Sequence, residues 1–192
     1  MPQAATPGTP ILLGLKNDVN LLADYDPSWV DAYAEEKARL DVALGDVAKA
    51  IEHFGSTSVP GMRAKPILDI IVGVSPFGDW ERCKAPLESL GYDFVANAGI
   101  PRHHIFGRGH DLTERTHILH IVDYDTEEWS LNLAFRDALR TDAALRTKYR
   151  AEKERAAAAA PEGRARYTAL KSSFISGMKS RLAAIMRPFT SA

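Results

Sequence analysis

Residues 52–74 read EHFGSTSVPGMRAKPILDIIVGV, and this stretch decides the fold expected for the chain. A loop of small and hydroxyl-bearing residues, 55–58, precedes an apolar strand that carries a single acidic residue, Asp69. Small side chains let backbone N–H groups approach a phosphate closely. A carboxylate inside so apolar a strand is costly unless a cation or a hydrogen-bond donor meets it. The stretch therefore predicts a binding site between the loop and the strand.

The sequence around this stretch predicts a β-sheet. Residues 47–54 and 67–74 have the pattern of strands, and the second is apolar on both faces, as in the middle of a sheet. Residues 92–96 and 103–107 predict two more strands, joined as a hairpin by turn-forming residues. Residues 116–122 (THILHIV) predict a further strand because they are rich in β-branched side chains.

Helical periodicity flanks these strands. Between residues 27 and 44 large side chains recur every three or four positions, with Asp26 as the expected N-cap and Gly45 as the stop. Residues 76–90 predict a surface helix that ends at Gly91. The strands and helices together predict a sheet with helices beside it.

The C-terminal third is expected to be helical. An apolar stripe runs from Tyr167 to Ile185 at intervals of three and four residues, and we expect it to cover the sheet as ordinary core. A homodimer interface is the alternative use of this stripe. We predict a single domain over residues 21–186, with a mobile tail over 1–20 and a short tail over 187–192.

Composition narrows the functional classes. The 24 basic and 25 acidic residues leave a net charge of −1, so no global field recruits nucleic acid or an anionic membrane. Cys83 has no cysteine partner within the chain, which favours a reducing compartment. No apolar stretch approaches the roughly 20 residues that span a bilayer, and no secretory signal is apparent. We expect a cytoplasmic protein that contacts neither nucleic acid nor membrane.

Hydroxyls, cations and a carboxylate are concentrated near the loop. Residues 56–58 supply hydroxyls, Arg63 and Lys65 supply positive charge, and Asp69 supplies the carboxylate. Phosphoryl and nucleotidyl transfer require these groups to hold phosphate, neutralise it and bind Mg²⁺. The spacing of a Walker motif is absent, so a P-loop is not predicted. The alternative is that residues 55–58 form an ordinary turn between a strand and a loop and bind no ligand.

Longer motifs in the chain resemble those of the GrpB family, also called UPF0157, a branch of the nucleotidyltransferase superfamily. The resemblance rests on several segments in order: 25–29 (YDPSW), 51–61 (IEHFGSTSVPG), 64–70 (AKPILDI), 116–120 (THILH), 133–140 (LAFRDALR), and Tyr167, Lys171, Phe174 and Ile175. It covers roughly residues 21–186. It implies an α/β (α+β) fold with a nucleotidyltransferase-like mixed sheet, flanking helices and a helical C-terminal segment.

The resemblance also implies a nucleotide site. Gly55 and Ser56 would lie in the turn that grips the phosphates of an NTP, expected to be ATP, and Asp69 would be the first carboxylate that holds Mg²⁺. Active members of the superfamily usually place a second carboxylate two residues further on, where this chain has Ile71. Glu52 could supply that second carboxylate, or be a solvated strand residue.

Further residues are candidates for the same site. Thr57 and Ser58 extend the phosphate-gripping loop, and Lys65 with Arg102 would stabilise leaving pyrophosphate. Arg108 flanks the same predicted hairpin strand as Arg102, and guanidinium groups bind phosphate bidentately.

The histidines and the last helix offer less decided candidates. His117 and His120 are three residues apart, so in a regular strand they face opposite ways and one of them is expected in the site. The resemblance suggests a functional role for Lys171. His53 reads equally well as a core imidazole, and no histidine or cysteine spacing predicts a zinc site.

Two functions from different classes follow. The first is a Mg²⁺-dependent nucleotidyltransferase-like enzyme that moves a nucleoside monophosphate to an unidentified small-molecule acceptor, either as the whole reaction or as activation for a ligation. The second is a catalytically degenerate module on the same fold that binds a nucleotide or a phosphorylated metabolite, and Ile71 motivates it.

Overall fold

The structure is a computed structural model that describes residues 13–97 and 101–186. At its centre lies a five-stranded sheet with the strand order β2-β3-β7-β5-β4. The strands are β2 (Ala48–Phe54), β3 (Leu68–Val74), β4 (Asp93–Asn97), β5 (His103–Arg108) and β7 (His117–Asp123). β3 and β7 are parallel, whereas the other neighbouring strands are antiparallel. The predicted strands and the mixed α/β fold are confirmed.

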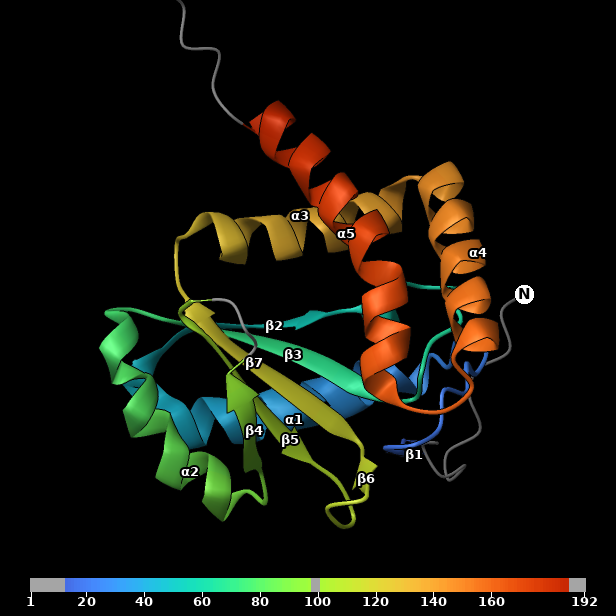
Figure 1. Cartoon of the computed structure of the whole chain (residues 1–192). Helices are drawn as coiled ribbons and strands as arrows, with labels where there is room; N and C mark the ends of the chain where they lie inside the picture. Colours follow the sequence, from blue (N-terminus) through green and yellow to red (C-terminus); the bar gives the residue numbers. More distant parts are fainter. Residues whose placement is uncertain (1–12, 98–100, 187–192) are drawn as a thin grey trace, which may run out of the picture.

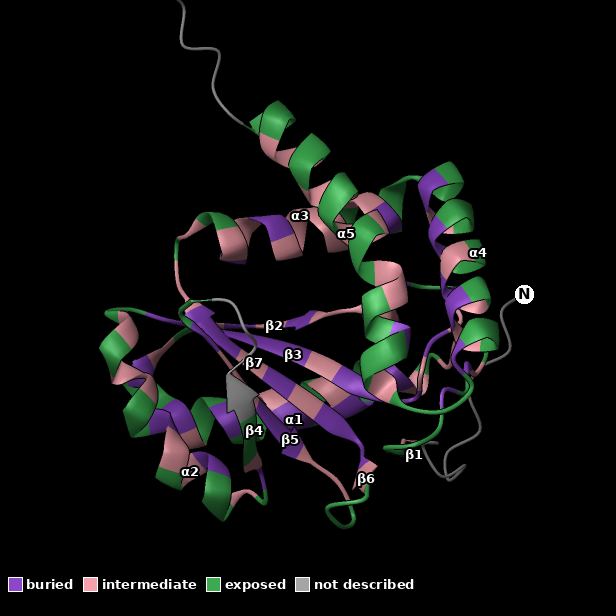
Figure 2. Cartoon of the chain, in the orientation of Figure 1, coloured by how far each residue is buried: buried purple, intermediate pink, exposed green. Residues whose placement is uncertain are grey.

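Helices cover both faces of this sheet (Figure 1). On one face lie α1 (Ser28–Leu44) and α2 (Lys84–Ser89), and on the other lie α3 (Glu127–Thr141) and α5 (Arg164–Met186). α4 (Ala143–Ala159) packs against α3 and α5. Figure 2 shows that buried residues concentrate in the strands and on the helix sides that face them. Among the described helices, none has both the length and the apolarity needed to cross a bilayer.

The segment predicted as one surface helix over residues 76–90 is divided. It forms the 3-10 helix η3 (Phe77–Cys83) followed by the short α-helix α2. Pro86 explains the division, because proline cannot donate to the carbonyl four residues earlier and its ring clashes with that carbonyl. An α-helix can hold proline only in its first turn, which is where Pro86 lies in α2.

Part of the predicted N-terminal tail belongs to the fold. β1 (Leu15–Lys16) pairs antiparallel with β6 (Glu114–Arg115), and Leu15 is buried. Asn20 is also buried, and its Nδ2 donates to the carbonyl of Ala160 at 2.6 Å. Residues 13–20 are therefore anchored, while residues 1–12 and 187–192 lie outside the described part of the chain.

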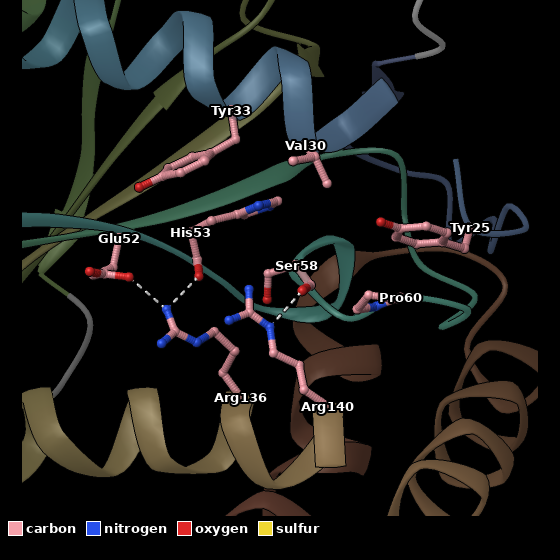
Figure 3. Close-up of a pocket in the computed structure, with 9 residues that line it drawn as sticks. All are labelled: Tyr25, Val30, Tyr33, Glu52, His53, Ser58, Pro60, Arg136 and Arg140. Carbon is pink, nitrogen blue, oxygen red and sulfur yellow. Dashed lines mark hydrogen bonds and ion pairs between the residues drawn. The ribbon is translucent and has the colours of Figure 1, made fainter. Parts of the chain in front are cut away.

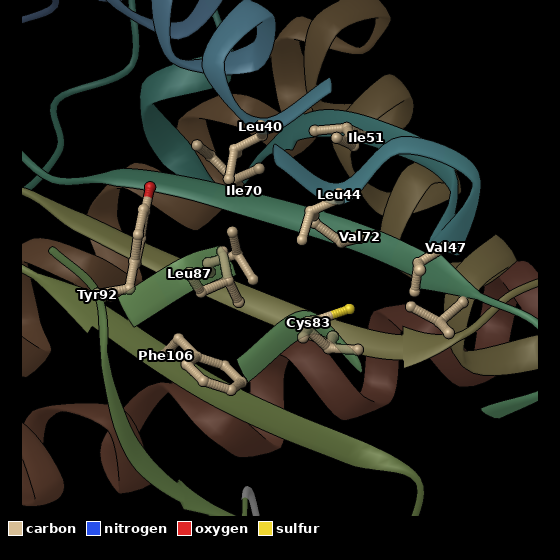
Figure 4. Close-up of a cluster of buried hydrophobic side chains, with 13 residues drawn as sticks. Leu40, Leu44, Val47, Ile51, Ile70, Val72, Cys83, Leu87, Tyr92 and Phe106 are labelled. Carbon is tan, nitrogen blue, oxygen red and sulfur yellow. The ribbon is translucent and has the colours of Figure 1, made fainter. Parts of the chain in front are cut away.

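The two faces of β3 divide the core. Ile70 and Val72 pack with residues of α1 and α2 in the main apolar cluster, which Figure 4 shows. Ile71 points to the other face, where it packs with Val122 and Trp129. Because side chains alternate along a strand, Asp69 shares the face of Ile71 and lies under α3 and α5. The candidate site therefore lies on the sheet face that α3 and α5 cover.

The short 3-10 helices η1 (Gly45–Val47) and η2 (Ser56–Ser58) complete the connections of β2. η2 is the hydroxyl-rich loop of the sequence, and it joins the end of β2 to the segment that leads into β3. Phe54, the last residue of β2, pairs in register with Asp69. The loop and the acidic residue are therefore neighbours because of strand pairing.

Candidate functional site

Asp69 lies directly against the turn that follows β2. Gly55 in that turn has φ +70° and ψ −171°, a conformation that residues with a side chain rarely adopt. A Cβ atom at position 55 would lie 2.3 Å from Oδ2 of Asp69. Glycine therefore allows the loop backbone and the carboxylate to share this space.

The loop hydroxyls differ in what they contact. Thr57 Oγ1 lies 3.0 Å from His53 Nε2 and donates to the carbonyl of Ile67, so it fastens the loop to the protein. Ser58 Oγ donates to the carbonyl of Gly55 at 2.7 Å. Ser56 makes no side-chain hydrogen bond to residues 13–97 or 101–186, and it lines the cavities beside Asp69. Of the three hydroxyls, that of Ser56 is available to a ligand.

A basic cavity of about 380 Å³ opens beside Asp69. Four cationic side chains line it together with the carboxylate, one from the loop before β3, one from α4 and two from α5: Lys65, Lys153, Arg164 and Lys171. Within the described residues, Asp69 forms no ion pair with any of them. Four cations around one carboxylate leave an excess of positive charge, so the cavity suits an anion with several negative oxygens.

Tyr167 holds two of these cations in place. Lys65 Nζ lies 4.0 Å from the centre of the Tyr167 ring, and Lys171 Nζ lies 4.8 Å from it. Lys65 also donates to Asn20 Oδ1, and Lys153 donates to the carbonyl of Arg63. Cation–π contacts and neutral acceptors orient the ammonium groups without neutralising their charge.

The pKa values reflect this crowding of charge. Burial, with the nearby cations Lys171 and Arg164, lowers the pKa of Lys65 to about 7. Burial and Lys171 hold the pKa of Lys153 well below its usual value. Burial raises the pKa of Asp69, although the surrounding lysines oppose this shift. A bound anion would offset the repulsion among the cations and favour their charged forms.

A second cavity of about 230 Å³ adjoins the basic one. Both are lined by five residues: Ser56, Asp69, His120, Thr168 and Lys171. Aromatic side chains form much of the second cavity, namely Phe54, Phe135 and Tyr149. Asp69 therefore lies where a cation-lined space meets an aromatic one, an arrangement suited to a ligand with a polyanionic part and a planar or apolar part.

The carboxylates near Asp69 restrict how a metal could bind. Within the described residues, no group of three or more His, Cys, Asp or Glu side chains is placed to hold a metal ion. Ile71 follows Asp69 on the same face, and Glu52 lies opposite Ile71 but pairs with Arg136 at 2.8 Å. Mg²⁺ can bind through one carboxylate and the phosphates of a substrate. The donor set fits an ion brought by phosphates, and it does not fit a site with two ions held by the protein.

The two histidines of β7 lie on opposite faces of the sheet, as the sequence predicted. His120 lines both cavities, and its Nδ1 lies 2.8 Å from His103 Nε2. His117 faces the α1 side, where Arg108 Nη2 approaches its ring nitrogens within 3.1–3.2 Å. Burial lowers the pKa of each to about 3, so both are neutral at pH 7. His120 is thus the histidine of this pair that lies near Asp69.

The predicted arginines lie away from the two cavities. Arg102 forms an ion pair of 2.6 Å with Asp123 at the last residue of β7. Arg108 forms an ion pair of 2.8 Å with the buried Glu36 of α1. Arg108 pairs in register with His117 and shares its sheet face, away from Asp69, and Arg102 lies beside the last residue of β7, far along the strand from Asp69.

Arg136 and Arg140 of α3 border a third, open pocket of about 370 Å³ at the β2 edge (Figure 3). Arg136 donates to Glu52 and to the carbonyl of His53, and Arg140 donates to the carbonyl of Ser58. Arg136 also lines the aromatic cavity. These contacts attach α3 to β2 and to the loop. Glu52 is therefore occupied by its ion pair with Arg136.

Sequence reasoning missed Lys153 and Arg164. In α4 the buried residues are Leu145, Tyr149, Lys153 and Ala156. Lys153 thus occupies a position of the helical stripe where an apolar residue is expected, and only 2% of it is exposed. A lysine inside an apolar stripe is the signal that could have identified it. Arg164 begins α5, and no comparable pattern marks it.

A family model and curated relatives identify the family of the chain. A family model described as GrpB protein matches residues 20–181. The glutamate-rich protein GrpB of Alkalihalophilus pseudofirmus is 32% identical over 167 residues, covering 85% of this chain and 96% of that protein. A UPF0157 protein of Streptomyces coelicolor is 35% identical over 168 residues, with 86% of each chain covered.

A solved structure gives the same result. The crystal structure of conserved protein GrpB from Enterococcus faecalis has a TM-score of 0.75 and 32% identity, covering 84% of this chain and 96% of that one. The residues matched by the family model, 20–181, include every residue that lines the two cavities. The chain belongs to the GrpB family.

Proposed function

We propose that the two adjoining cavities bind a nucleoside triphosphate and that the protein transfers its nucleoside monophosphate to a small acceptor. The observation that carries this proposal is Asp69 at the junction of a space lined by four cations and a space lined by three aromatic rings. The triphosphate would occupy the basic cavity, and the aromatic cavity would take the base or the acceptor. The near-neutral net charge favours a small acceptor over a polymer.

The basic residues would contact different phosphates of the nucleotide. Lys65, Lys153 and Arg164 would neutralise the phosphates that leave as pyrophosphate, while Ser56 would donate a hydrogen bond to one of their oxygens. Lys171 lines both cavities and would reach the phosphate at which the bond is broken. Charge that develops on the leaving group is stabilised most by donors already in place, which suits buried lysines.

Mg²⁺ would arrive with the triphosphate and be held by Asp69 together with phosphate oxygens. The ion would neutralise charge and polarise the reacting phosphate. Glu52 stays outside this arrangement because Arg136 engages it. The buried, single Cys83 is compatible with a cytoplasmic location for this chemistry.

A specific observation favours a second candidate, a binding module without catalysis. Ile71 follows Asp69 on the same strand face, and the described residues offer no second free carboxylate beside it. Such a module would bind a nucleotide or a phosphorylated metabolite through the lysines alone. It would need no Mg²⁺, whereas the enzyme would.

Calorimetric titration with ATP and the other NTPs, with and without Mg²⁺, separates the two functions. The enzyme predicts binding that requires Mg²⁺, and pyrophosphate release when hydroxyl- or amine-bearing acceptors are present. Binding without Mg²⁺ and without turnover identifies the module. Absence of binding to every NTP and to pyrophosphate contradicts both.

Charge variants test the site itself. Lys171→Gln should weaken triphosphate binding about tenfold or more, which corresponds to about 1.4 kcal/mol. Arg166→Gln is the matched control, since Arg166 is an exposed cation of the same helix. Asp69→Asn should abolish the benefit of Mg²⁺ and strengthen binding of metal-free pyrophosphate, because the carboxylate repels it. Equal effects of Lys171→Gln and Arg166→Gln would show that the anion binds elsewhere.

A further inference from the structure

A chain of three polar side chains leads from the surface of α3 to the Asp69 cavity. His120 Nδ1 lies 2.8 Å from His103 Nε2, and His103 Nδ1 lies 3.6 Å from Oε1 of Glu128. His103 is buried, and its Nδ1 has no hydrogen-bond partner within the described residues. The nucleotide transfer proposed above gives no role to Glu128 or His103.

The carboxylate of Glu128 determines which nitrogens carry hydrogen. An ionised carboxylate can only accept hydrogen bonds. If His103 Nδ1 carried no hydrogen, its lone pair would face the negative charge of Glu128, which is unfavourable. At 3.6 Å the contact is too long for a hydrogen bond, but the attraction still favours an N–H at Nδ1. Asn132 and Lys179 both donate to Oε1 of Glu128, which keeps the carboxylate charged and in place.

The tautomer of His103 then determines that of His120. A neutral imidazole has one donor and one acceptor nitrogen, so a hydrogen at His103 Nδ1 leaves Nε2 as the acceptor. His120 Nδ1 must therefore be the donor across the 2.8 Å contact. Nε2 of His120 is left with a lone pair, and it has no protein hydrogen bond within residues 13–97 and 101–186. His120 lines both cavities, so this lone pair is available to a ligand.

We propose that Glu128 and His103 are positioning residues that hold His120 as the base of the reaction, with a bare Nε2 toward the Asp69 cavity. The base step rests on the proposed function, because the negative charge of a bound triphosphate would raise the pKa of His120 above its value of about 3 in the ligand-free protein. An acceptor hydroxyl forms its bond to the α-phosphorus, the bond from that phosphorus to the departing oxygen breaks, pyrophosphate leaves, and the hydroxyl proton passes to Nε2. As in a nucleophile–histidine–carboxylate triad, a carboxylate orients the histidine that acts as the base, but here a second imidazole lies between them.

Other charged groups near His120 leave this assignment intact. Asp69 lines the same cavities and could accept a hydrogen bond, but within the described residues it forms no hydrogen bond or ion pair with His120. Lys171 also lines these cavities, and Lys179 lies beside Glu128. Ammonium groups only donate, so neither can supply the acceptor that would favour a hydrogen at His120 Nε2. Phe54 packs edge-on at 5.0 Å between ring centres and offers no hydrogen-bonding group.

The tautomer can be read directly by NMR in the ligand-free protein, so the result stands whether or not nucleotide binds. Multiple-bond ¹H–¹⁵N spectra of ¹⁵N-histidine-labelled protein at neutral pH should show His120 protonated at Nδ1 and bare at Nε2, with assignment by loss of its signals in His120→Gln. A hydrogen at His120 Nε2 in the unmodified protein overturns the proposal.

Variants test whether Glu128 and His103 determine the tautomer of His120. Glu128→Ala and His103→Phe should each populate the Nε2–H form of His120, while Glu127→Gln, an exposed glutamate beside Glu128, should not. If the protein turns over, Glu128→Ala should lower kcat about tenfold or more with unchanged affinity for Mg²⁺-ATP. A His120 tautomer that stays the same in both Glu128→Ala and His103→Phe shows that Glu128 and His103 do not position it.

Discussion

The hydroxyl of Tyr92 donates a 2.8 Å hydrogen bond to Glu36, a carboxylate that is 2% exposed on the sheet face away from Asp69. Arg108 and Arg39 also donate to this carboxylate, at 2.8 and 2.9 Å. Burial and the adjacent Glu36 raise the pKa of Tyr92 well above its usual value. Arg108 therefore has a structural role that its sequence position does not reveal.

Glu36→Gln should lower the free energy of unfolding by about 2–4 kcal/mol. The substitution leaves the guanidinium of Arg108 buried without its countercharge, and breaking one side of a buried pair is costly. Urea denaturation at pH 7 measures the change. Asp41→Asn in the same helix should cost under about 1 kcal/mol, because the Lys37–Asp41 pair is exposed. Anion binding at Asp69 should survive Glu36→Gln, and its loss would contradict the separation of the two faces.

Gly55→Ala should lower the free energy of unfolding by about 2–3 kcal/mol and displace Asp69. The new Cβ meets Oδ2 of Asp69 at 2.3 Å, and the backbone at φ +70° strains any side chain. Gly61→Ala separates these causes, since Gly61 has φ +75° but no atom within 4 Å of its added Cβ. Thermal unfolding of both variants gives the comparison. Equal losses would mean that backbone strain alone requires glycine at position 55.

Anion binding should depend on pH through Lys65. Its pKa is lowered to about 7, mainly by burial, so above pH 7 the free protein must take up a proton to present a charged Lys65. Affinity for pyrophosphate should therefore fall between pH 7 and pH 8.5, with net proton uptake in calorimetry across buffers of different ionisation enthalpy. Lys65→Arg should reduce this uptake, because arginine stays charged, whereas the share of Lys153 would remain. Uptake that is unchanged in Lys65→Arg would assign it to groups other than Lys65.

Acid should destabilise the protein through buried histidines. Burial, with nearby arginines, lowers the pKa of His53 and of His117 to about 3, against 6.5 in the unfolded chain. Between these values the unfolded state binds more protons, so the free energy of unfolding falls as pH decreases. Each histidine should cost about 2 kcal/mol between pH 7 and pH 5.

Denaturation at both pH values checks this dependence. His117→Gln should reduce the loss on acidification by the share of one histidine. His110→Gln should leave it unchanged, since the His110 side chain is 73% exposed. A pH dependence that His117→Gln does not alter would assign the acid sensitivity to other groups.

Prediction from sequence succeeded where local pattern suffices. The strands at β2, β3 and β7 follow from apolar runs, and the opposite faces of His117 and His120 follow from strand alternation. It failed where one residue overrides a pattern, as Pro86 does in dividing the helix over 76–90. It also misplaced residues 13–20, because two-residue pairing such as that of β1 with β6 leaves no periodic signal.

The candidate site was predicted less completely than the fold. Loop residues and Asp69 are adjacent because β2 and β3 pair, and neighbouring strands in sequence often pair in space. Lys153 and Arg164 reach the same cavity from α4 and α5. Their approach depends on how helices pack across the sheet, which no local spacing encodes.

The sequence by itself determined the strands, the glycine turn and the acidic residue beside it, since these depend on side-chain period and on the freedom of glycine. Tertiary structure decided which charges surround Asp69 and which imidazole faces it. Lys65, Lys153 and Lys171 come from a loop and two helices, and they gather because burying the apolar faces of α4 and α5 brings their cations to the end of β3. Packing free energy, summed over many distant contacts, sets that placement.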